Sequence, residues 1–143
     1  MAKIKHIAIA TQDPDKTAKF YIEVFGLREI AKINSPGALG YHLTDGDINL
    51  AILKFKNHQT AGVPEGKEYT GLHHIGFEVD NTADIGRRLA AAEAPIRDDI
   101  NDALGLRKGL PAHINVEVKY SAPDGVIIDV SETGWAGTAR HPR

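Results

Sequence analysis

The chain has 143 residues, 42% of them hydrophobic and 25% charged, which is typical of a globular protein with one core. Its formal net charge of −2 argues against a nucleic-acid-binding surface, and the absence of cysteine excludes disulfides, thiolate metal sites and a cysteine nucleophile. No apolar run approaches the roughly 20 residues of a membrane span, and the N-terminus lacks a signal-peptide core, so we expect a cytoplasmic protein. Seven histidines are many for this length, and histidine is the commonest metal ligand.

The first half of the chain predicts one helix among four strands. The helix begins after Asp13, which can cap its N-terminus, with Pro14 at the first helical position, and it ends at Gly26. Apolar residues at three- and four-residue spacings between these ends predict one buried face. The strands are separated by turn-forming residues and span 4–10, 27–33, 38–44 and 47–55.

The second half predicts a similar order of elements. Residues 57–71 are rich in glycine and charge and are interpreted as a linker. A helix follows Asn81, its predicted cap, and ends before Pro95. The predicted strands span 72–79, 112–121 and 126–131, with a loop over 101–111 and a loosely held tail over 133–143.

The two halves carry a short internal repeat. The segment HIAIAT, which starts at His6, resembles HIGFEV, which starts at His74, 68 residues later. A turn and a helix follow each copy, so each half is interpreted as a β-α-β-β-β module, over about residues 1–56 and 72–132. We predict a single α+β domain over 1–143, with helices on the outer faces of two sheets.

Strand side chains alternate between two faces, and the predicted faces differ in chemistry. One face is bulky and apolar, as at Ile7, and would pack under the helices. The other face has small residues, which favour a cleft over a packed core, interrupted by His6, His74, Glu117 and Asp129. Two neutral imidazoles and one carboxylate are a typical site for Fe, Mn, Ni, Co or Zn that leaves coordination positions open. We therefore predict a divalent metal ion as cofactor.

The sequence resembles the vicinal oxygen chelate superfamily in four segments. These are KHIAIA from Lys5, TAKFYIEVFGL from Thr17, LHHIGFEV from Leu72 and PDGVIID from Pro123. The family includes glyoxalase I, extradiol dioxygenases, methylmalonyl-CoA epimerase and the bleomycin and fosfomycin resistance proteins. The resemblance implies paired β-α-β-β-β modules around a metal-bearing cleft. It also implies a homodimer, because family members often pair.

Carried over to this chain, the resemblance implies a metal site formed by His6, Asn49, His74 and Asp129. Two of these positions depart from the family's pattern. Glyoxalase I usually has glutamate where Asn49 stands, and an amide oxygen is a weaker, uncharged ligand. The last position is also usually glutamate, and Asp129 is one methylene shorter. Both departures count against a standard glyoxalase I, whereas extradiol dioxygenases use only three ligands.

Three activities stay open within the resemblance. The segment HHIGFEVDN from His73 resembles its counterpart in methylmalonyl-CoA epimerase. An extradiol dioxygenase would need an acid–base histidine and a tyrosine; His113 and Tyr120 lie nearby, but the strand pattern turns Tyr120 toward the helices. Glu117 is a candidate general base for isomerase or lyase chemistry, although a solvated strand residue is the simpler interpretation.

The leading hypothesis is a metal-dependent enzyme that chelates a small substrate through adjacent oxygens, as a lyase, an isomerase or a ring-cleavage dioxygenase. The alternative is a metal-free small-molecule-binding or resistance protein of the bleomycin resistance type. A third possibility, a structural or regulatory dimer with a vestigial cleft, is disfavoured by the polar cleft face.

Several other residues carry weaker expectations. His73 is expected to point away from His74 and to be structural or exposed. His42 lies where it could contact a substrate, but an ordinary strand residue is the simpler interpretation. Trp135 is interpreted as a cover for the cleft or a subunit interface, or equally as ordinary packing. His58 and His141 are expected to be exposed.

Overall fold

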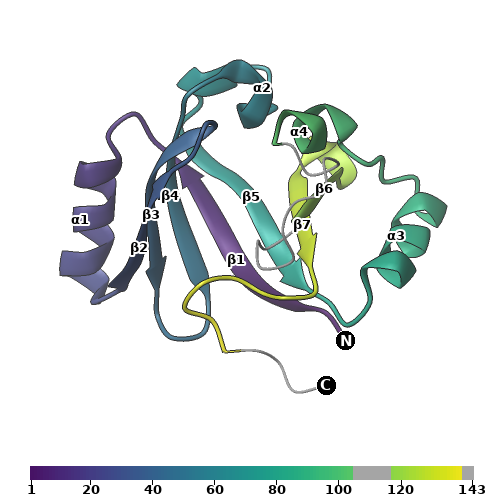
Figure 1. Ribbon diagram of the computed structural model, residues 1–143, viewed down its shortest axis with the longest axis horizontal. Helices are drawn as coiled ribbons and strands as arrows, with labels where there is room; N and C mark the ends of the chain where they lie inside the picture. The colour runs from purple at the N-terminus through teal and green to yellow at the C-terminus, as the bar shows by residue number, and fades with distance from the viewer. Residues whose placement is uncertain (105–116, 140–143) are drawn as a thin grey trace.

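The computed structural model describes residues 1–104 and 117–139 (Figure 1). The strands in this part of the chain form one continuous β-sheet. The strands are β1 (Lys3–Ala10), β2 (Arg28–Asn34), β3 (Ala38–Thr44), β4 (Asn49–Phe55), β5 (Gly71–Glu78), β6 (Val118–Ser121) and β7 (Ile127–Ser131). The helices are α1 (Pro14–Phe25), α2 (His58–Ala61), α3 (Thr82–Ala91) and α4 (Asp98–Ala103), with 3₁₀ turns η1 (Gly66–Glu68) and η2 (Pro123–Gly125). Among the described residues, no helix is long and apolar enough to cross a membrane.

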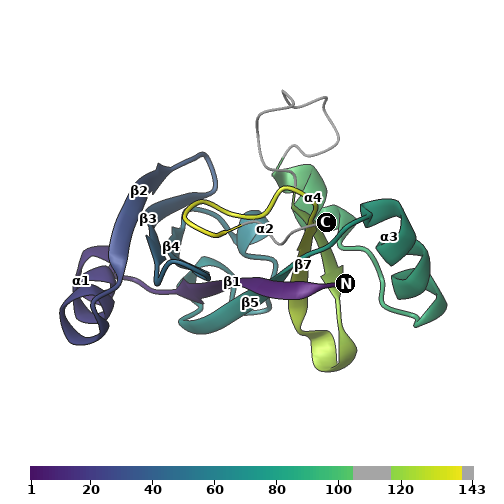
Figure 2. The same cartoon turned by 90° about the horizontal axis from the view of Figure 1, so that it is seen from below.

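The sheet joins the two halves of the chain through their first strands. The strand order is β2-β3-β4-β1-β5-β7-β6, and β1 and β5 run antiparallel in the middle. β1 also pairs in parallel with β4, and β5 with β7. The two predicted sheets are therefore one, because the edges of β1 and β5 pair with each other instead of staying open. α1 lies at one end of the sheet and α3 at the other (Figures 1 and 2).

Capping contacts confirm the predicted starts of α1 and α3. Asp13 accepts a hydrogen bond from the Lys16 N–H at 3.1 Å, and Asn81 accepts one from the Asp84 N–H at 2.9 Å. Each bond satisfies a backbone donor that the first helical turn leaves without a partner. The predicted end of α1 is also confirmed, because Gly26 adopts the left-handed conformation with φ 74°.

Short helices occupy two regions that were expected to be irregular. The predicted linker contains η1 and also α2, which begins where Asn57 accepts a hydrogen bond from the Thr60 N–H at 2.8 Å. The predicted loop over 101–111 begins inside α4. Helices of four and six residues are too short to show a hydrophobic period, so the sequence pattern does not predict them. The rest of that loop, and residues 112–116 of the next predicted strand, lie outside the described residues.

Within residues 1–104 and 117–139, two packed apolar clusters lie in the first half of the chain and the adjoining linker. One cluster, beneath α1, contains Ala18, Leu43 and Ile52, and a second, beside α2, includes Phe55 and Ala61. In the second half, by contrast, no residue of α3 is buried. Of the strand residues expected under that helix, Ile128 and Val130 are buried, whereas Ile75 and Phe77 are only half-buried.

Candidate metal centre

Three neighbouring strands in the middle of the sheet bring two histidines and an aspartate together. His6 on β1 and Asp129 on β7 both pair with Gly76 of β5, from opposite sides. His74 lies two residues before this glycine on the same strand. All three polar side chains are buried. The structure thus brings His6, His74 and Asp129 together as a candidate metal site, and we call these three residues the metal centre.

Two β-bulges shape the pairing of β1 with β5. Lys5 on β1 and His73 on β5 are the extra, unpaired residues, and they lie 68 positions apart, in the same place of the repeat. A bulge interrupts the alternation of side chains, so Lys5 and His6 are both buried, and so are His73 and His74. The prediction that His73 points away from His74 is wrong for this reason.

The nitrogen and oxygen atoms of the metal centre converge on one point. His6 Nε2 lies 3.0 Å from His74 Nε2, and His74 Nε2 lies 3.1 Å from Asp129 Oδ2. One donor atom from each of the three residues lies within 4.8 Å of the others. This spacing suits three atoms that bind one central ion.

The partner of the His6 ring fixes the position of its proton. Asn49 donates from its amide nitrogen to the Ala136 carbonyl at 2.9 Å, so its amide oxygen is the atom that faces His6. His6 Nδ1–H donates to this oxygen at 2.8 Å, which leaves Nε2 with a bare electron pair. The structure therefore places Asn49 behind His6, in contact with Nδ1, and not among the converging atoms.

A second chain of hydrogen bonds fixes His74 in the same way. His73 Nε2–H donates to the Ala61 carbonyl at 2.6 Å, so Nδ1 of the neutral His73 ring can only accept. His74 Nδ1–H donates to that nitrogen at 2.7 Å, which leaves His74 Nε2 bare. Both histidines thus present an unprotonated Nε2 toward Asp129. Such second-layer partners orient histidine ligands in metal sites.

Burial keeps these rings neutral. It lowers the pKa of His6 to about 3, helped by the neighbouring His74, and it lowers the pKa of His73 to about 3. Burial also lowers the pKa of His74. For Asp129, burial alone would raise the pKa, but the Lys119 ammonium beside its carboxylate holds the pKa well below its usual range. The metal centre therefore offers two neutral nitrogens and one ionised carboxylate.

Two ionisable side chains from the segment around β6, Lys119 and Glu117, lie beside the metal centre. Lys119 Nζ donates to Asp129 Oδ1 at 2.6 Å. Burial raises the pKa of Glu117 to about 8, and repulsion from Asp129 adds to the rise. Glu117 is half-buried, lies just before β6 and lines the cavity beside the metal centre, where these surroundings raise its pKa toward neutrality.

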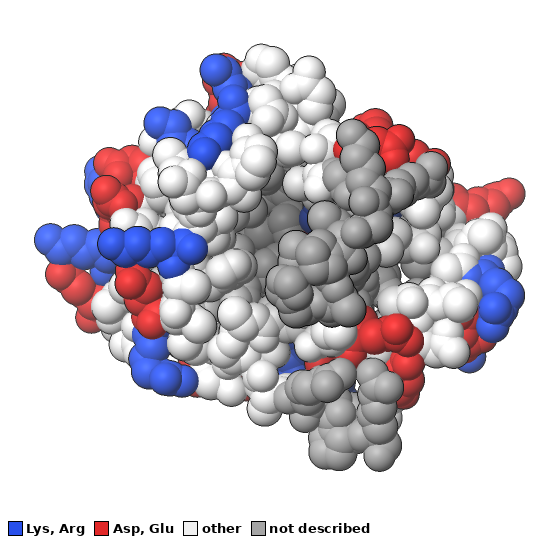
Figure 3. Space-filling view, in the orientation of Figure 1, with Lys and Arg blue, Asp and Glu red and all other residues white. Residues whose placement is uncertain are grey.

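A cavity of about 480 Å³ opens over the metal centre. Its polar wall includes His6, His74, Glu117 and Lys119. The rest of the lining is mainly apolar, and we call it the apolar wall; it includes Ile33, Ala38, Ala51, Leu53, Phe55 and Leu104. Figure 3 shows a hollow near the centre of the molecule, and the described residues that border it are mainly uncharged. The cavity therefore suits a small ligand with a polar end and an apolar body.

The segment after β7 crosses the sheet on the cavity side (Figures 1 and 2). Trp135 stacks on His6 with ring centres 4.9 Å apart and planes 2° from parallel. Thr44 holds the segment further along by donating to the Gly137 carbonyl at 3.0 Å. The prediction of a loosely held tail is wrong at these positions, and Trp135 serves as packing for a residue of the metal centre.

The remaining sequence candidates divide between the cavity and the surface. His42 lines the cavity, with Nδ1 3.1 Å from the Asn49 amide nitrogen, so it is more than an ordinary strand residue. Tyr120 lies against α3, as predicted from the strand pattern, and His58 is exposed. His113 and His141 lie outside the described residues.

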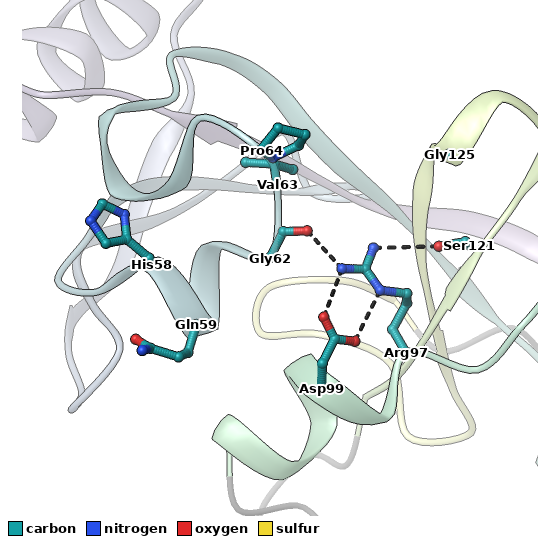
Figure 4. A pocket seen from close by; sticks show the side chains of 9 residues that line it. All are labelled: His58, Gln59, Gly62, Val63, Pro64, Arg97, Asp99, Ser121 and Gly125. Carbon is teal, nitrogen blue, oxygen red and sulfur yellow. Dashed lines mark hydrogen bonds and ion pairs between the residues drawn. The ribbon is translucent and has the colours of Figure 1, made fainter.

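A separate cavity of about 620 Å³ lies between α2, α4, the end of β6 and η2 (Figure 4). Arg97 dominates its polar lining and donates to Asp99 at 3.0 and 2.9 Å, to the Gly62 carbonyl at 2.7 Å and to Ser121 at 3.4 Å. These bonds tie α2, α4 and β6 together. The guanidinium is thus occupied by a structural role, and the chemistry concentrates at the metal centre.

Sequence and structure comparisons agree on the fold family. The sequence pattern of the Glyoxalase/Bleomycin resistance protein/Dioxygenase superfamily matches residues 3–108. Among curated protein sequences, none matches the chain. Solved structures with the same fold include a hypothetical protein from Bacillus halodurans C-125, with 18% identity over 91% of this chain and 93% of that one, at a TM-score of 0.69.

Methylmalonyl-CoA epimerases are also among the similar structures. The Streptomyces coelicolor enzyme in complex with 2-nitronate-propionyl-CoA has 20% identity over 90% of this chain and 92% of that one, at a TM-score of 0.68. The Mycobacterium tuberculosis enzyme has 14% identity over 90% and 85%, at 0.63. At these identities the likeness shows the fold alone. The family pattern, which matches most of the sequence, shows that the chain belongs to the Glyoxalase/Bleomycin resistance protein/Dioxygenase superfamily.

Proposed function

We propose that this chain is a metal-dependent enzyme that holds a small substrate through adjacent oxygens and moves a proton, as an isomerase or a lyase does. The observation that carries the proposal is the convergence of His6 Nε2, His74 Nε2 and Asp129 Oδ2. Their hydrogen-bond partners leave both nitrogens bare, so these atoms repel one another unless a cation lies among them. Two imidazoles and one carboxylate fit Fe, Mn, Ni, Co or Zn.

The residues around the metal centre would prepare it for this role. Asn49 orients His6, and His73 orients His74, so the ligand set contains three residues and leaves positions open for substrate oxygens. A bound divalent ion would supply Lewis-acid chemistry that stabilises negative charge on those oxygens. The apolar wall of the cavity would hold the carbon skeleton of the substrate and limit access of water.

Glu117 is the proposed proton-transfer group. Its pKa of about 8 lies near neutrality, so its carboxyl can both accept and release a proton there. Ring cleavage has less support, because Tyr120 lies against α3 and away from the metal centre. The methylmalonyl-CoA epimerases among the similar structures also favour a proton-transfer reaction.

Elemental analysis of untagged protein, purified beside the His6→Ala and Asp129→Ala variants, tests this proposal. We expect about one metal ion per wild-type chain and loss of the ion from both variants, because each substitution removes one of three ligands. His58→Ala is the matched control, since it removes an exposed histidine outside the cavity. Absence of metal from the wild type, even after incubation with divalent ions, would overturn the proposal.

One observation favours the metal-free alternative. Lys119 already neutralises Asp129 at 2.6 Å, so the polar wall has an internal counter-charge. A binding or resistance protein would use the same cavity without chemistry. Binding of a small aromatic ligand by calorimetry, with a chelator present throughout, would support this alternative if its affinity equals that measured with metal.

The homodimer, the cytoplasmic location and the single domain over residues 1–143 stay predictions. Light scattering of the purified protein measures the first of these, and a mass of twice the 15.5 kDa chain would support it. Limited proteolysis would test the last, because a single domain resists cleavage between its two modules.

A further inference from the structure

We propose that Lys119 is a built-in counter-cation of the metal centre, which neutralises Asp129 in the metal-free protein and weakens the binding of a divalent ion. This inference rests on the proposed function, since it concerns the affinity of the same three ligands. Lys119 is neither part of the repeated segments nor one of the expected ligands, so the inference adds a residue to the site.

Asp129 divides its two oxygens between the lysine and the metal centre. Oδ1 accepts from Lys119 Nζ at 2.6 Å, while Oδ2 lies 3.1 Å from the bare His74 Nε2. Only 7% of the lysine side chain and none of the aspartate side chain is exposed, so water screens this pair little. The ammonium thus lies one carboxylate away from the point where the three ligand atoms converge.

The backbone of Lys119 is fixed from the α4 side. Its N–H donates to Asn101 Oδ1 at 3.0 Å, and its carbonyl accepts from the Arg97 N–H at 2.9 Å and from Asn101 Nδ2 at 3.3 Å. On the sheet side, Lys119 pairs directly with Asp129 in the β6–β7 register. The side chain therefore starts from a fixed backbone position, and its burial and its bond to Asp129 hold it beside the metal centre.

The net charge of the metal centre explains why Lys119 should weaken the binding of a divalent ion. The three ligands alone carry a charge of −1, because both imidazoles are neutral, and the ammonium brings the sum to zero. A divalent ion a few ångströms from a fixed positive charge is repelled by several times the thermal energy, even at an effective dielectric constant of about 20. The lysine should therefore reduce the affinity of the metal centre by about tenfold or more.

Titration calorimetry with Zn²⁺ and Mn²⁺ on the full chain tests the proposal. Lys119→Met should bind each ion about tenfold or more tightly than the wild type, whereas Lys119→Arg, which keeps the charge, should stay close to it. Lys5→Met is a matched control. Lys5 is also a buried lysine, but it pairs with the exposed Asp47 and does not line the cavity. Its loss should leave the affinity unchanged.

A second variant and a second measurement guard against failure to fold. Lys119→Gln keeps a hydrogen-bond donor for Asp129, and thermal unfolding with and without Zn²⁺ reports folding and binding together. The metal-induced rise in melting temperature should be larger in both Lys119 variants that lose the charge than in the wild type.

The outcomes separate this inference from the proposed function. Equal or weaker metal binding in Lys119→Met and Lys119→Gln, in a wild type that binds metal through His6, overturns the counter-cation and leaves the proposed function intact. An equal gain in Lys5→Met also overturns the counter-cation, because the effect would then be non-specific. Absence of metal binding in every protein overturns both proposals.

Discussion

The two walls of the cavity come from different halves of a repeated chain, and they differ in chemistry. The first half supplies most of the apolar wall, from β2, β3 and β4, and contributes His6. The second half supplies His74, Asp129, Glu117 and Lys119, so nearly all of the charge lies on one side. Each half has a β-bulge at the same place of the repeat, but the extra residue is Lys5 in one and His73 in the other. Similar backbones thus carry different chemistry.

The two halves also differ in their packing, which is more apolar in the first half and more polar in the second. α1 buries Ala18 against β3 and β4, whereas no residue of α3 is buried. The second half replaces part of this apolar packing with a buried network of hydrogen bonds and ion pairs around Asp129. Such networks are strongly destabilised by the loss of one member, so the polar half should be more sensitive to single substitutions.

Asp129→Asn should give the largest effect, because it leaves the Lys119 ammonium buried without its counter-charge. Loss of one partner of a buried ion pair costs about 3–5 kcal/mol of unfolding free energy. Urea unfolding of the metal-free protein measures this loss. The double variant D129N/K119M should recover much of it, since both charges are then absent. An equal loss in the single and double variants would show that the ion pair is not the cause.

His73→Phe should weaken metal binding about 10–100-fold, as expected for loss of a second-layer partner. The ring shape is kept, but His74 Nδ1 loses its acceptor, so the bare electron pair is no longer fixed at Nε2. Calorimetric titration with Zn²⁺ measures the change. Lys5→Met alters the equivalent bulge of the first half and should leave the affinity unchanged. Wild-type affinity in His73→Phe would remove His73 from the site.

Gly76→Ala tests whether the site depends on close packing of Trp135. The new Cβ would lie 2.6 Å from Trp135 Cζ2 and 2.8 Å from His6 Cβ, and overpacking of this kind costs about 1–3 kcal/mol. The first half has Ala8 at the equivalent position of the repeat. Trp135 is the single tryptophan, so its fluorescence reports the displacement directly. Gly86→Ala on α3, where the nearest atom is the Tyr120 hydroxyl at 3.3 Å, is the control. An unshifted emission spectrum and wild-type stability would refute the packing argument.

Local sequence rules predict the two longer helices, most of the strands and the residues of the metal centre. Alternation along strands places His6, His74 and Asp129 on one face, and this holds because none of the three is itself a bulge residue. Helix caps at Asp13 and Asn81 are equally local, since each side chain bonds within its own first turn.

Features of the site that depend on contacts between distant segments could not be predicted from local sequence rules. His73 joins the site through a bulge, which is a property of the β1–β5 register. The only signal in the sequence was the pair of adjacent histidines, His73 and His74. Lys119 and Trp135 reach the metal centre through tertiary contacts that no spacing in the sequence encodes. Asn49 lies on the expected strand, but the direction of its amide is set by the Ala136 carbonyl, 87 residues away.

The pH dependence of stability should show the smallest effect and separates Glu117 from the histidines. The folded-state pKa of Glu117, about 8, lies above its ordinary value of 4.5, so its proton stabilises the folded protein below pH 4.5 and this stabilisation is lost as the pH rises through 8. Between pH 7 and 8 the unfolding free energy of the metal-free protein should fall by about 1 kcal/mol. Over this range His6 and His73, with pKa values of about 3, stay neutral and add no slope.

Glu117→Gln carries no titrating proton and should flatten the profile, as measured by urea unfolding in half-unit pH steps. A wild-type slope that persists in Glu117→Gln would place the titrating group elsewhere and remove Glu117 as the proton carrier near neutral pH.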